Sequence, residues 1–444
     1  MSWICTLTMS ESTSKTIQSP ILVASYECLL CGTTDIGPDD IASHKKQHGA
    51  FKRYGLLWPE KLSAGIPIDF RSNIPTYSSP TLAHALGVSC VYIRNEGVNH
   101  SGSMKDYIVR QALAAGRAKG FTRFSVVSSG NHAVSLAMNT DSKRETAILF
   151  TPSSSSKIPF LITFPHVVAV GMHDALIEDV YNLVTQVKLN GIYDINAHNE
   201  CLLPGLIPVA SDVLSLDPLP THVLAGVGNG TYLAGIGWGL KTLSKSYQKL
   251  PKIIPVGMKG AFPSEDAYTL KESIVEYSEF FEQEDVIDAA EGSIAIESYS
   301  MPQLMHAVSL TKGFPLGELT NRDLAAAYEL LATDAHLIAR GAIPEPTGIM
   351  GLAAALKWKD RFTQKDVLHC SFTGHGVKDL ETISRILSPA LKDSLIKAAR
   401  RDRPDLLPRE PDAQGISIHI PKDTDADKLN MLLRKNTSVL DPIE

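Results

Sequence analysis

The 444-residue chain lacks long hydrophobic runs, a strong charge of one sign and a dense set of cysteines. Its best apolar stretch, residues 158–172, is broken by Pro159 and Pro165 and is too short to cross a membrane as a helix. A net charge of −6 gives no basic field for nucleic acid, and six scattered cysteines are not a disulfide scaffold. No basic residue precedes Lys15, so a signal-peptide pattern is missing as well. We expect a cytoplasmic protein without a membrane or nucleic-acid partner.

Apolar strand-like runs alternate with helical patterns between about residues 68 and 395. The strand-like runs are residues 88–93, 124–127, 147–150, 167–170, 221–225, 252–256 and 367–371. Residues 105–119 have the pattern of a helix. This alternation predicts an α/β architecture with mainly parallel sheets.

The composition changes after residue 395. The charged stretch 400–404 and the prolines that follow it predict a linker. A strand at 416–420 and a helix that runs to about residue 434 should come next, with Thr424 as the N-cap of the helix.

Four junctions between an expected strand and an expected helix carry unusual residues. At the first, Asn99–Asp106, a lysine opens a helix. The helix dipole disfavours a cation there and lowers the pKa of the amine, which suits a lysine that forms a Schiff base. A solvated surface lysine is the ordinary alternative.

The other three junctions resemble ligand loops. Ser128–Ala133 offers backbone N–H groups and hydroxyls for a carboxylate, although such a turn can simply cap a helix. Gly226–Thr231 is typical of a phosphate site before a helix. A dinucleotide site is disfavoured, because Thr231 replaces the last glycine and no acidic residue follows before Glu265. The fourth junction, Ser371–Asp379, is uninformative alone.

In their order and spacing the four motifs resemble the fold-type II pyridoxal-phosphate (PLP) enzymes, specifically threonine synthases and their relatives. The stretch Glu345–Gly348 is similar too, and the resemblance covers residues 70–395. It implies two open, mainly parallel sheets flanked by helices. It also implies a small amino-acid substrate, and we expect a homodimer.

The resemblance divides the chain into parts. Residues 51–120 and 206–395 would form a large cofactor-binding domain, and residues 121–205 a smaller domain that closes over the substrate. Residues 1–50 would be a flexible N-terminus with a small Cys/His module. Residues 396–444 would be the linker and a C-terminal appendage.

The resemblance also assigns roles to residues. Lys105 would form the Schiff base with pyridoxal 5′-phosphate and move the substrate's protons. Asn131 would bond the ring hydroxyl, and Thr373 would face the pyridine nitrogen, where a neutral hydroxyl favours elimination over transamination. The cofactor phosphate would be bound by Gly228, Asn229, Gly230, Thr231 and Tyr232. The substrate carboxylate would be bound by Ser128, Ser129, Gly130, Asn131 and His132.

Three stretches depart from the threonine-synthase pattern. The lysine motif is Met104-Lys105-Asp106-Tyr107 where Phe-Lys-Asp-Arg is usual, and Tyr77–Leu82 is a degraded Gly-x-Thr-Pro-Leu segment. The Ser-x-Asn-Pro-His-Arg stretch that grips the substrate phosphate aligns with Ala197–Leu202, which lacks both the serine and the arginine. Because a doubly charged group needs charge-assisted donors, O-phosphohomoserine is a doubtful substrate.

The sequence thus predicts a PLP-dependent, threonine synthase-like lyase that performs β- or γ-elimination or replacement on a substituted amino acid, in specialised metabolism. A serine/threonine ammonia-lyase and a β-replacement synthase are alternatives. A zinc-finger regulatory protein on an inactive scaffold is a third, but the retention of Lys105, Asn131 and the glycine loop argues against it.

The spacing Cys28-x2-Cys31-x12-His44-x3-His48 matches a zinc finger, with Tyr26 and Ile41 near the expected core positions. Asp35 stands where a central aromatic residue is usual, and Gly37-Pro38-Asp39 interrupts the pattern. Relatives of threonine synthase often begin with a short Cys-x2-Cys segment. A structural zinc ion, no metal and a nucleic-acid contact all stay open.

Overall fold

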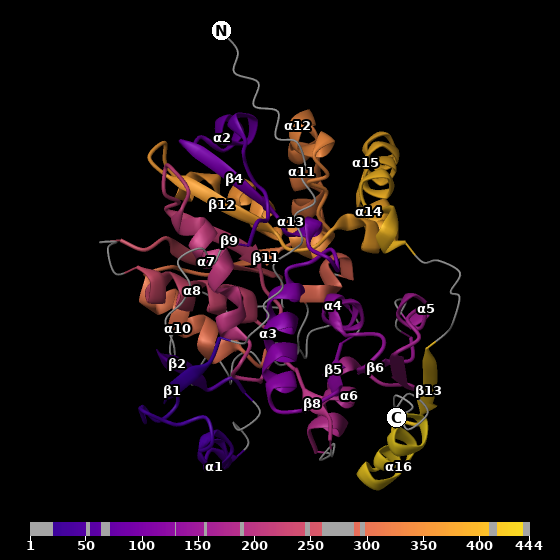
Figure 1. The fold of residues 1–444 in the computed structure, drawn as a ribbon. Helices are drawn as coiled ribbons and strands as arrows, with labels where there is room; N and C mark the ends of the chain where they lie inside the picture. Colours follow the sequence, from indigo (N-terminus) through magenta and orange to yellow (C-terminus); the bar gives the residue numbers. More distant parts are fainter. Residues whose placement is uncertain are drawn as a thin grey trace.

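The computed structural model contains three sheets flanked by helices (Figure 1). It describes residues 21–49, 54–63, 72–128, 130–154, 158–186, 191–244, 249–259, 288–293, 298–407 and 415–437.

The largest sheet has six strands in the order β11-β10-β9-β12-β4-β3. They are β3 (Thr76–Ser78), β4 (Cys90–Asn95), β9 (His222–Gly226), β10 (Lys252–Met258), β11 (Leu316–Leu319) and β12 (Val367–Phe372). All neighbours are parallel except β3 and β4. Val223 and Ala225 pack on one face and Leu224 on the other, as the two-residue period of a strand requires. This sheet is therefore buried on both faces.

Helices cover both faces of the six-stranded sheet. On one face lie α3 (Lys105–Ala118), α7 (Ile207–Leu214), α8 (Thr231–Leu243) and α10 (Met301–Thr311). On the other lie α2 (Pro80–Leu86), α11 (Asn321–Ala332), α12 (Ala335–Ala339), α13 (Pro346–Lys357) and α14 (Leu380–Ile386). The predicted two-sided α/β layering is confirmed.

The second sheet has five parallel strands in the order β13-β7-β6-β5-β8. They are β5 (Arg123–Val127), β6 (Thr146–Pro152), β7 (Val167–Met172), β8 (Tyr193–Asp194) and β13 (Ile416–Ile420). Its helices are α4 (Asn131–Asn139), α5 (Ile158–Leu161), α6 (Ile177–Gln186) and α16 (Ala426–Thr437). The strand predicted at 416–420 is present and extends this sheet beside β7.

The N-terminal module consists of β1 (Val23–Cys28), α1 (Ile41–Lys46) and β2 (Leu57–Leu62), with β1 and β2 antiparallel. It lies at the lower left of Figure 1, next to α10. The Gln303 side chain of α10 donates to Leu57 O over 2.7 Å, and Trp238 Nε1 of α8 donates to Pro59 O over 2.8 Å. These bonds attach the module to the helices of the six-stranded sheet.

Two expectations for the C-terminal region were wrong. Residues 400–402 are not linker, because α15 (Pro389–Asp402) continues through them and buries Leu395 and Ala399. Thr424 is not a capping side chain, because the Asp425 carboxylate accepts from Lys428 N over 2.8 Å while the Thr424 hydroxyl has no partner among the described residues. Aspartate caps a helix as well as threonine does, and the chain uses the one nearer to the helix.

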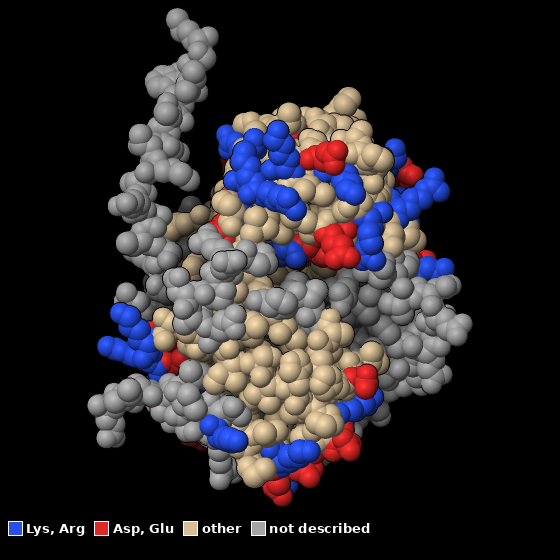
Figure 2. Space-filling model, turned by 90° about the vertical axis from the view of Figure 1, so that its right-hand side faces the viewer, with Lys and Arg blue, Asp and Glu red and all other residues tan. Residues whose placement is uncertain are grey.

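Short 3₁₀ helices complete the described part of the chain: η2 (Glu96–Val98), η3 (Leu203–Leu206), η5 (Asp288–Ser293), η6 (Lys359–Arg361), η7 (Gly376–Asp379) and η8 (Pro404–Leu406). None of the helices in the described ranges is both long and apolar enough to traverse a bilayer. On the face shown in Figure 2, basic side chains gather in the upper half of the view, and acidic side chains lie among them. This face carries both signs of charge.

Candidate active site

Lys105 lies at the first residue of α3, and the loop before it is attached to the end of β12. Met104 N donates to Thr373 O over 2.9 Å, and His375 N donates to Gly102 O over 2.8 Å. These two bonds place the predicted lysine and the predicted Thr373 at one junction of the six-stranded sheet, at the carboxyl end of β12, where ligands bind in open α/β sheets. We call residues 97–105 the lysine loop.

Asp106, the residue after the lysine, joins the lysine loop to helix α4 beside the five-stranded sheet. Its buried carboxylate accepts from Ser101 N over 2.9 Å within the same loop. It also accepts from the Ser135 hydroxyl over 2.6 Å and from Asn139 Nδ2 over 2.9 Å, both in α4. Since α4 begins at Asn131, this carboxylate fixes the predicted Asn131 relative to Lys105.

Two charged side chains that the sequence analysis did not include among the site residues bind Asn131. Its Nδ2 donates to Glu345 Oε1 over 2.5 Å, and Lys378 Nζ donates to its Oδ1 over 2.6 Å. Lys378 Nζ also donates to Ser101 O and Gly102 O, over 3.1 and 2.9 Å. One ammonium group therefore holds both the lysine loop and Asn131. Glu345 was part of a supporting motif and Lys378 of an uninformative one, so only their motifs pointed to them.

The surroundings of Lys105 weaken its affinity for a proton. Burial lowers the pKa of Lys105 to about 8, although the Glu345 carboxylate acts in the opposite direction. Burial, followed by the positive charge of Lys105, lowers the pKa of His132 to about 3. The imidazole of His132 is thus neutral, and among the described residues its Nε2 has no hydrogen-bond partner. A buried polar atom without a partner in the protein can accept a hydrogen bond from, or donate one to, water or a ligand.

The glycine loop, residues 226–232, joins β9 to α8. Gly230 adopts φ +84°, and a Cβ at Gly226 would lie 2.7 Å from Thr347 O, so both positions favour glycine. The N–H groups of the first turn of α8, which begins at Thr231, have no acceptor within the helix. Such a helix start is suited to a phosphate.

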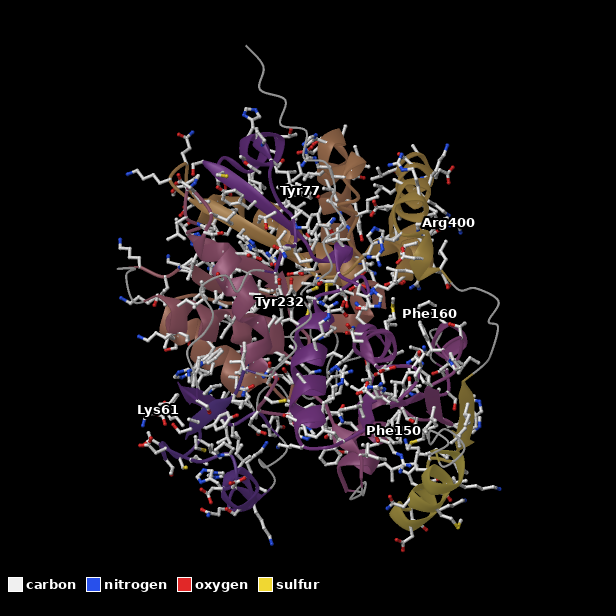
Figure 3. The ribbon with its side chains drawn as sticks, in the orientation of Figure 1. Lys61, Tyr77, Phe150, Phe160, Tyr232 and Arg400 are labelled. Atoms are coloured by element: carbon white, nitrogen blue, oxygen red, sulfur yellow. The ribbon has the colours of Figure 1, made fainter. Side chains whose placement is uncertain are left out.

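Tyr232, labelled near the centre of Figure 3, connects the glycine loop to the lysine loop. Its buried hydroxyl donates to Glu96 Oε1 over 2.8 Å, and Asn99 Nδ2 donates to Glu96 Oε2 over 2.7 Å. The side chain of Tyr232 is therefore engaged by Glu96, so Tyr232 would contribute to the predicted phosphate site through its backbone N–H.

A buried arginine from β4 lies beside the position at which the lysine motif departs from the threonine-synthase pattern. Arg94 Nε donates to Glu96 Oε1 over 2.5 Å, and its NH2 donates to the Tyr107 hydroxyl over 2.9 Å. Neighbouring Glu96 keeps the pKa of the Arg94 guanidinium raised despite its burial. The Arg94 guanidinium thus reaches Tyr107 of α3 from strand β4, at the position where the threonine-synthase motif itself carries an arginine.

The predicted carboxylate-binding residues lie at the start of α4. Ser128 N donates to Phe150 O over 3.0 Å, and Gly130 N donates to the Ser128 hydroxyl over 3.1 Å. Asn131 and His132 follow in the first turn of the helix. Ser129 lies outside the described residues.

The segment 197–202 offers no charge at the two aligned positions. Ala197 O accepts from the Ser300 hydroxyl over 3.0 Å, and Leu202 is fully buried in the core. Arg340, a possible substitute, is exposed and lies over the ring of Tyr77, 5.1 Å from its centroid. The predicted loss of the contacts to a substrate phosphate stays a prediction.

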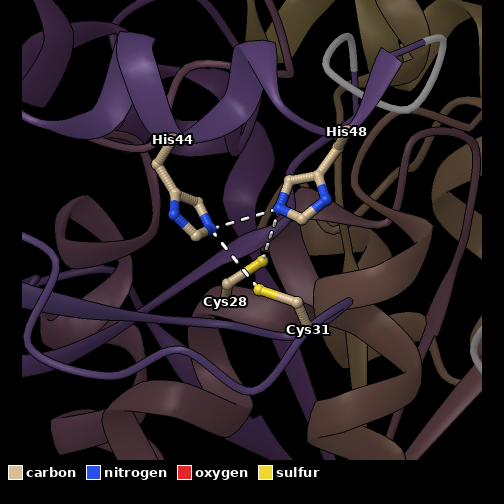
Figure 4. Close-up of side chains that lie close together, drawn as sticks. All are labelled: Cys28, Cys31, His44 and His48. Atoms are coloured by element: carbon tan, nitrogen blue, oxygen red, sulfur yellow. Dashed lines mark hydrogen bonds between the residues drawn. The ribbon is translucent and has the colours of Figure 1, made fainter.

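The four predicted metal ligands of the N-terminal module converge (Figure 4). The sulfur atoms of Cys28 and Cys31 and the ligand nitrogens of His44 and His48 all lie within 4.8 Å of one another. Asp35, which stands where a zinc finger usually has its central aromatic residue, is exposed. Its neighbour Ile36 is buried in the core of the module in its place.

The fold and the site have the features expected of fold-type II PLP enzymes. One open sheet carries the lysine and the glycine loop at its strand ends, and the asparagine follows a strand of the second sheet. Comparison with known proteins agrees. Residues 69–374 match the family model "Pyridoxal-phosphate dependent enzyme". The threonine synthase of Methanocaldococcus jannaschii is 24% identical over 359 residues, which cover 78% of this chain and 85% of the relative. That of Methanosarcina acetivorans is 22% identical over 398 residues, covering 84% and 93%.

A solved structure is also similar to this chain. It is the processed form of threonine deaminase isoform 2 from Solanum lycopersicum, with a TM-score of 0.55, 16% identity, and coverage of 84% of this chain and 97% of that chain. At this identity the likeness shows the fold. The chain belongs to the pyridoxal-phosphate dependent enzymes, and the prediction of a PLP-dependent, threonine synthase-like lyase is confirmed at that level.

Proposed function

We propose that Lys105 holds pyridoxal 5′-phosphate covalently and that the glycine loop binds the cofactor's phosphate. The N–H groups of Gly228, Asn229, Gly230, Thr231 and Tyr232 would bind that phosphate. Asn131 and Thr373 would contact the ring. When bound, the cofactor supplies an electron sink for negative charge at the substrate Cα. The observation that carries this proposal is the half-buried Lys105, whose amine has a lowered pKa, beside a neutral His132 with an unpartnered Nε2.

The protein's own groups would bind the substrate and transfer its protons. The start of α4, with the Ser128 hydroxyl and the neutral His132, binds the substrate carboxylate, because a helix N-terminus attracts an anion. Lys105 Nζ takes the proton from the substrate Cα and returns one to the leaving group. A pKa of about 8 suits both transfers, since the amine accepts and donates protons near neutral pH. Ser129, Gly130 and Asn131 complete the carboxylate site.

The reaction that these groups favour is β- or γ-elimination or replacement on a substituted amino acid. Thr373 would present a hydroxyl, not a carboxylate, to the ring nitrogen, which disfavours transamination. Ala197 and Leu202 provide no charged donors for a phosphorylated substrate. A serine/threonine ammonia-lyase is the second candidate, favoured by the structural likeness to a threonine deaminase. A β-replacement synthase is the third.

Product analysis with a panel of amino acids tests the proposal. Serine, threonine, O-acetylated and O-phosphorylated homoserine are supplied with and without an added thiol. Release of 2-oxo acid without thiol indicates elimination, and a new thioether indicates replacement. No product from any β- or γ-substituted amino acid, with transamination in its place, would contradict the proposal. Thr373→Asp should increase transamination if Thr373 faces the ring.

We also propose that the enzyme is a cytoplasmic homodimer whose substrate is a small amino acid. Residues 51–120 and 206–395 would form the cofactor-binding domain, and residues 121–205 the domain that closes over the substrate. Sedimentation of the purified protein and protease mapping with and without substrate would test the assembly and the closure.

A further inference from the structure

The Cys/His cluster of the N-terminal module has the dimensions of a metal site. Cys28 Sγ lies 3.4 Å from His48 Nε2, Cys31 Sγ lies 3.6 Å from His44 Nε2, and the two Nε2 atoms are 3.1 Å apart (Figure 4). Tetrahedral zinc, with bonds of about 2.3 Å to sulfur and about 2.0–2.1 Å to nitrogen, separates sulfur from nitrogen by about 3.5 Å and two nitrogens by about 3.4 Å. The four side chains therefore converge on one point as zinc ligands do.

Local structure explains this convergence. Cys28 ends β1, and Gly32 N donates back to Cys28 O over 2.8 Å, which turns Cys31 toward Cys28. His44 lies on α1, and His48 lies in the turn after that helix, where its N donates to Lys45 O over 3.1 Å, so that the two rings meet. Two thiols and two imidazoles form a ligand set that binds zinc in preference to magnesium or calcium.

We propose that Cys28, Cys31, His44 and His48 bind a structural Zn²⁺ ion, and that the ion positions α1 against the segment 197–202. Four protein ligands fill a tetrahedral shell and leave no open coordination position for a substrate. The ion is therefore structural, and its role does not depend on the proposed reaction.

The contact that carries this positioning follows directly after a ligand. Lys45, next to His44, forms an ion pair with Glu200, and its Nζ lies 3.4 Å from His198 O. Lys45 is 8% exposed, an unusual burial for a lysine, and the ion pair with Glu200 accounts for it. Fixing His44 on the metal thus fixes Lys45 against the segment 197–202.

The same segment is bonded on its other side to the glycine-loop region. The Ser300 hydroxyl donates to Ala197 O over 3.0 Å, and Ser300 N donates to Asn229 O over 3.2 Å. Tyr181 of α6 adds a hydrogen bond to His198. The segment 197–202 is thereby held between the metal module and the glycine loop.

Metal analysis of the purified full-length enzyme tests the ion. We expect about one equivalent of zinc per chain. After exchange for Co²⁺, the visible spectrum should show tetrahedral bands and thiolate-to-cobalt charge transfer. Cys31→Ser and His48→Asn should lose the metal and these bands, while Cys90→Ser, at a cysteine outside the cluster, should retain both. Less than about a tenth of an equivalent from zinc-supplemented cells, or an octahedral cobalt spectrum, would overturn the zinc site.

Hydrogen–deuterium exchange tests the positioning. Lys45→Met should keep the zinc but raise exchange at the backbone amides of residues 197–202 on the order of ten-fold. Lys46→Met, its exposed neighbour on α1, is the matched control and should leave exchange unchanged. Cys31→Ser should raise exchange in both α1 and the segment. If a zinc-loaded Lys45→Met and a metal-free Cys31→Ser both keep the wild-type protection at 197–202, the ion does not position this segment. Far-UV circular dichroism confirms that each variant is folded.

Discussion

The two neighbours of the glycine loop are built differently. The lysine loop reaches it through Glu96 and Tyr232, keeps the Lys-Asp pair of the family's motif at Lys105, and is fixed by charged groups from several parts of the chain. The segment 197–202 reaches it through Ser300, has lost the motif residues, and is fixed by Lys45 and Tyr181. The difference leads us to propose that the chain keeps the cofactor chemistry of its family and differs from threonine synthases in how it recognises the substrate.

The largest effect should come from a substitution in the lysine loop. Lys105→Ala removes both the covalent attachment and the proton carrier, so turnover should fall by about 10⁴-fold or more. The fold should persist, because no described hydrogen bond in the core uses the Lys105 amine. Steady-state assays beside Lys365→Ala, an exposed lysine, are the measurement, and substantial residual activity in Lys105→Ala would refute the assignment.

From the segment 197–202 we predict that the enzyme turns over O-phosphohomoserine poorly. Two lost charge-assisted hydrogen bonds, each contributing about 1.5–3 kcal/mol, weaken transition-state binding by roughly 10²-fold or more. Release of threonine and phosphate gives kcat/KM for this substrate. A value near those of ordinary biosynthetic enzymes, about 10⁴ M⁻¹s⁻¹ or higher, would show that another cation replaces the missing arginine.

Arg403, the residue after α15, tests more sharply how the lysine loop is held in place. Arg403 NH1 donates to Gly97 O over 2.5 Å and to Asn99 O over 2.9 Å, and NH2 donates to His100 O over 3.0 Å. Arg403→Met leaves these carbonyls without donors, which costs about 1–2 kcal/mol and should weaken cofactor binding about ten-fold. Fluorescence titration of the apoenzyme measures it, with exposed Arg400→Met as control. Equal affinities in the two variants would mean that Arg403 does not position the loop.

The smallest expected effect is on pH dependence. If Lys105 holds the cofactor, its neutral amine would be the reactive form, so the rate of cofactor uptake by apoenzyme should rise with pH through a midpoint near 8. The Glu345 carboxylate raises this pKa, and Glu345→Gln should therefore move the midpoint to lower pH and speed uptake at pH 7 a few-fold. Stopped-flow absorbance gives both profiles, and a midpoint above 10 in either protein would contradict the buried environment.

Sequence could predict features that depend on local spacing. Patterns within single short stretches of sequence predict the α/β layering, the helix that begins at Lys105, the strand at 416–420 and the Cys/His cluster. It could not assign Lys378, whose bond to Asn131 spans 247 residues, because nothing local marks that pairing. The role of Arg403 could not be predicted for another reason. A charged stretch before proline is typical of a linker, and it is the burial of Ala399 in the structure that reveals the helix.

The central claim is that Lys105 carries the cofactor. Borohydride reduction of the purified enzyme fixes a pyridoxyl group on the lysine that binds it, and tryptic peptides identify that lysine by mass spectrometry. The account predicts one modified peptide, with the added mass at Lys105, and none in Lys105→Ala. A pyridoxyl group on any other lysine, or on none, in an enzyme that remains active would contradict it.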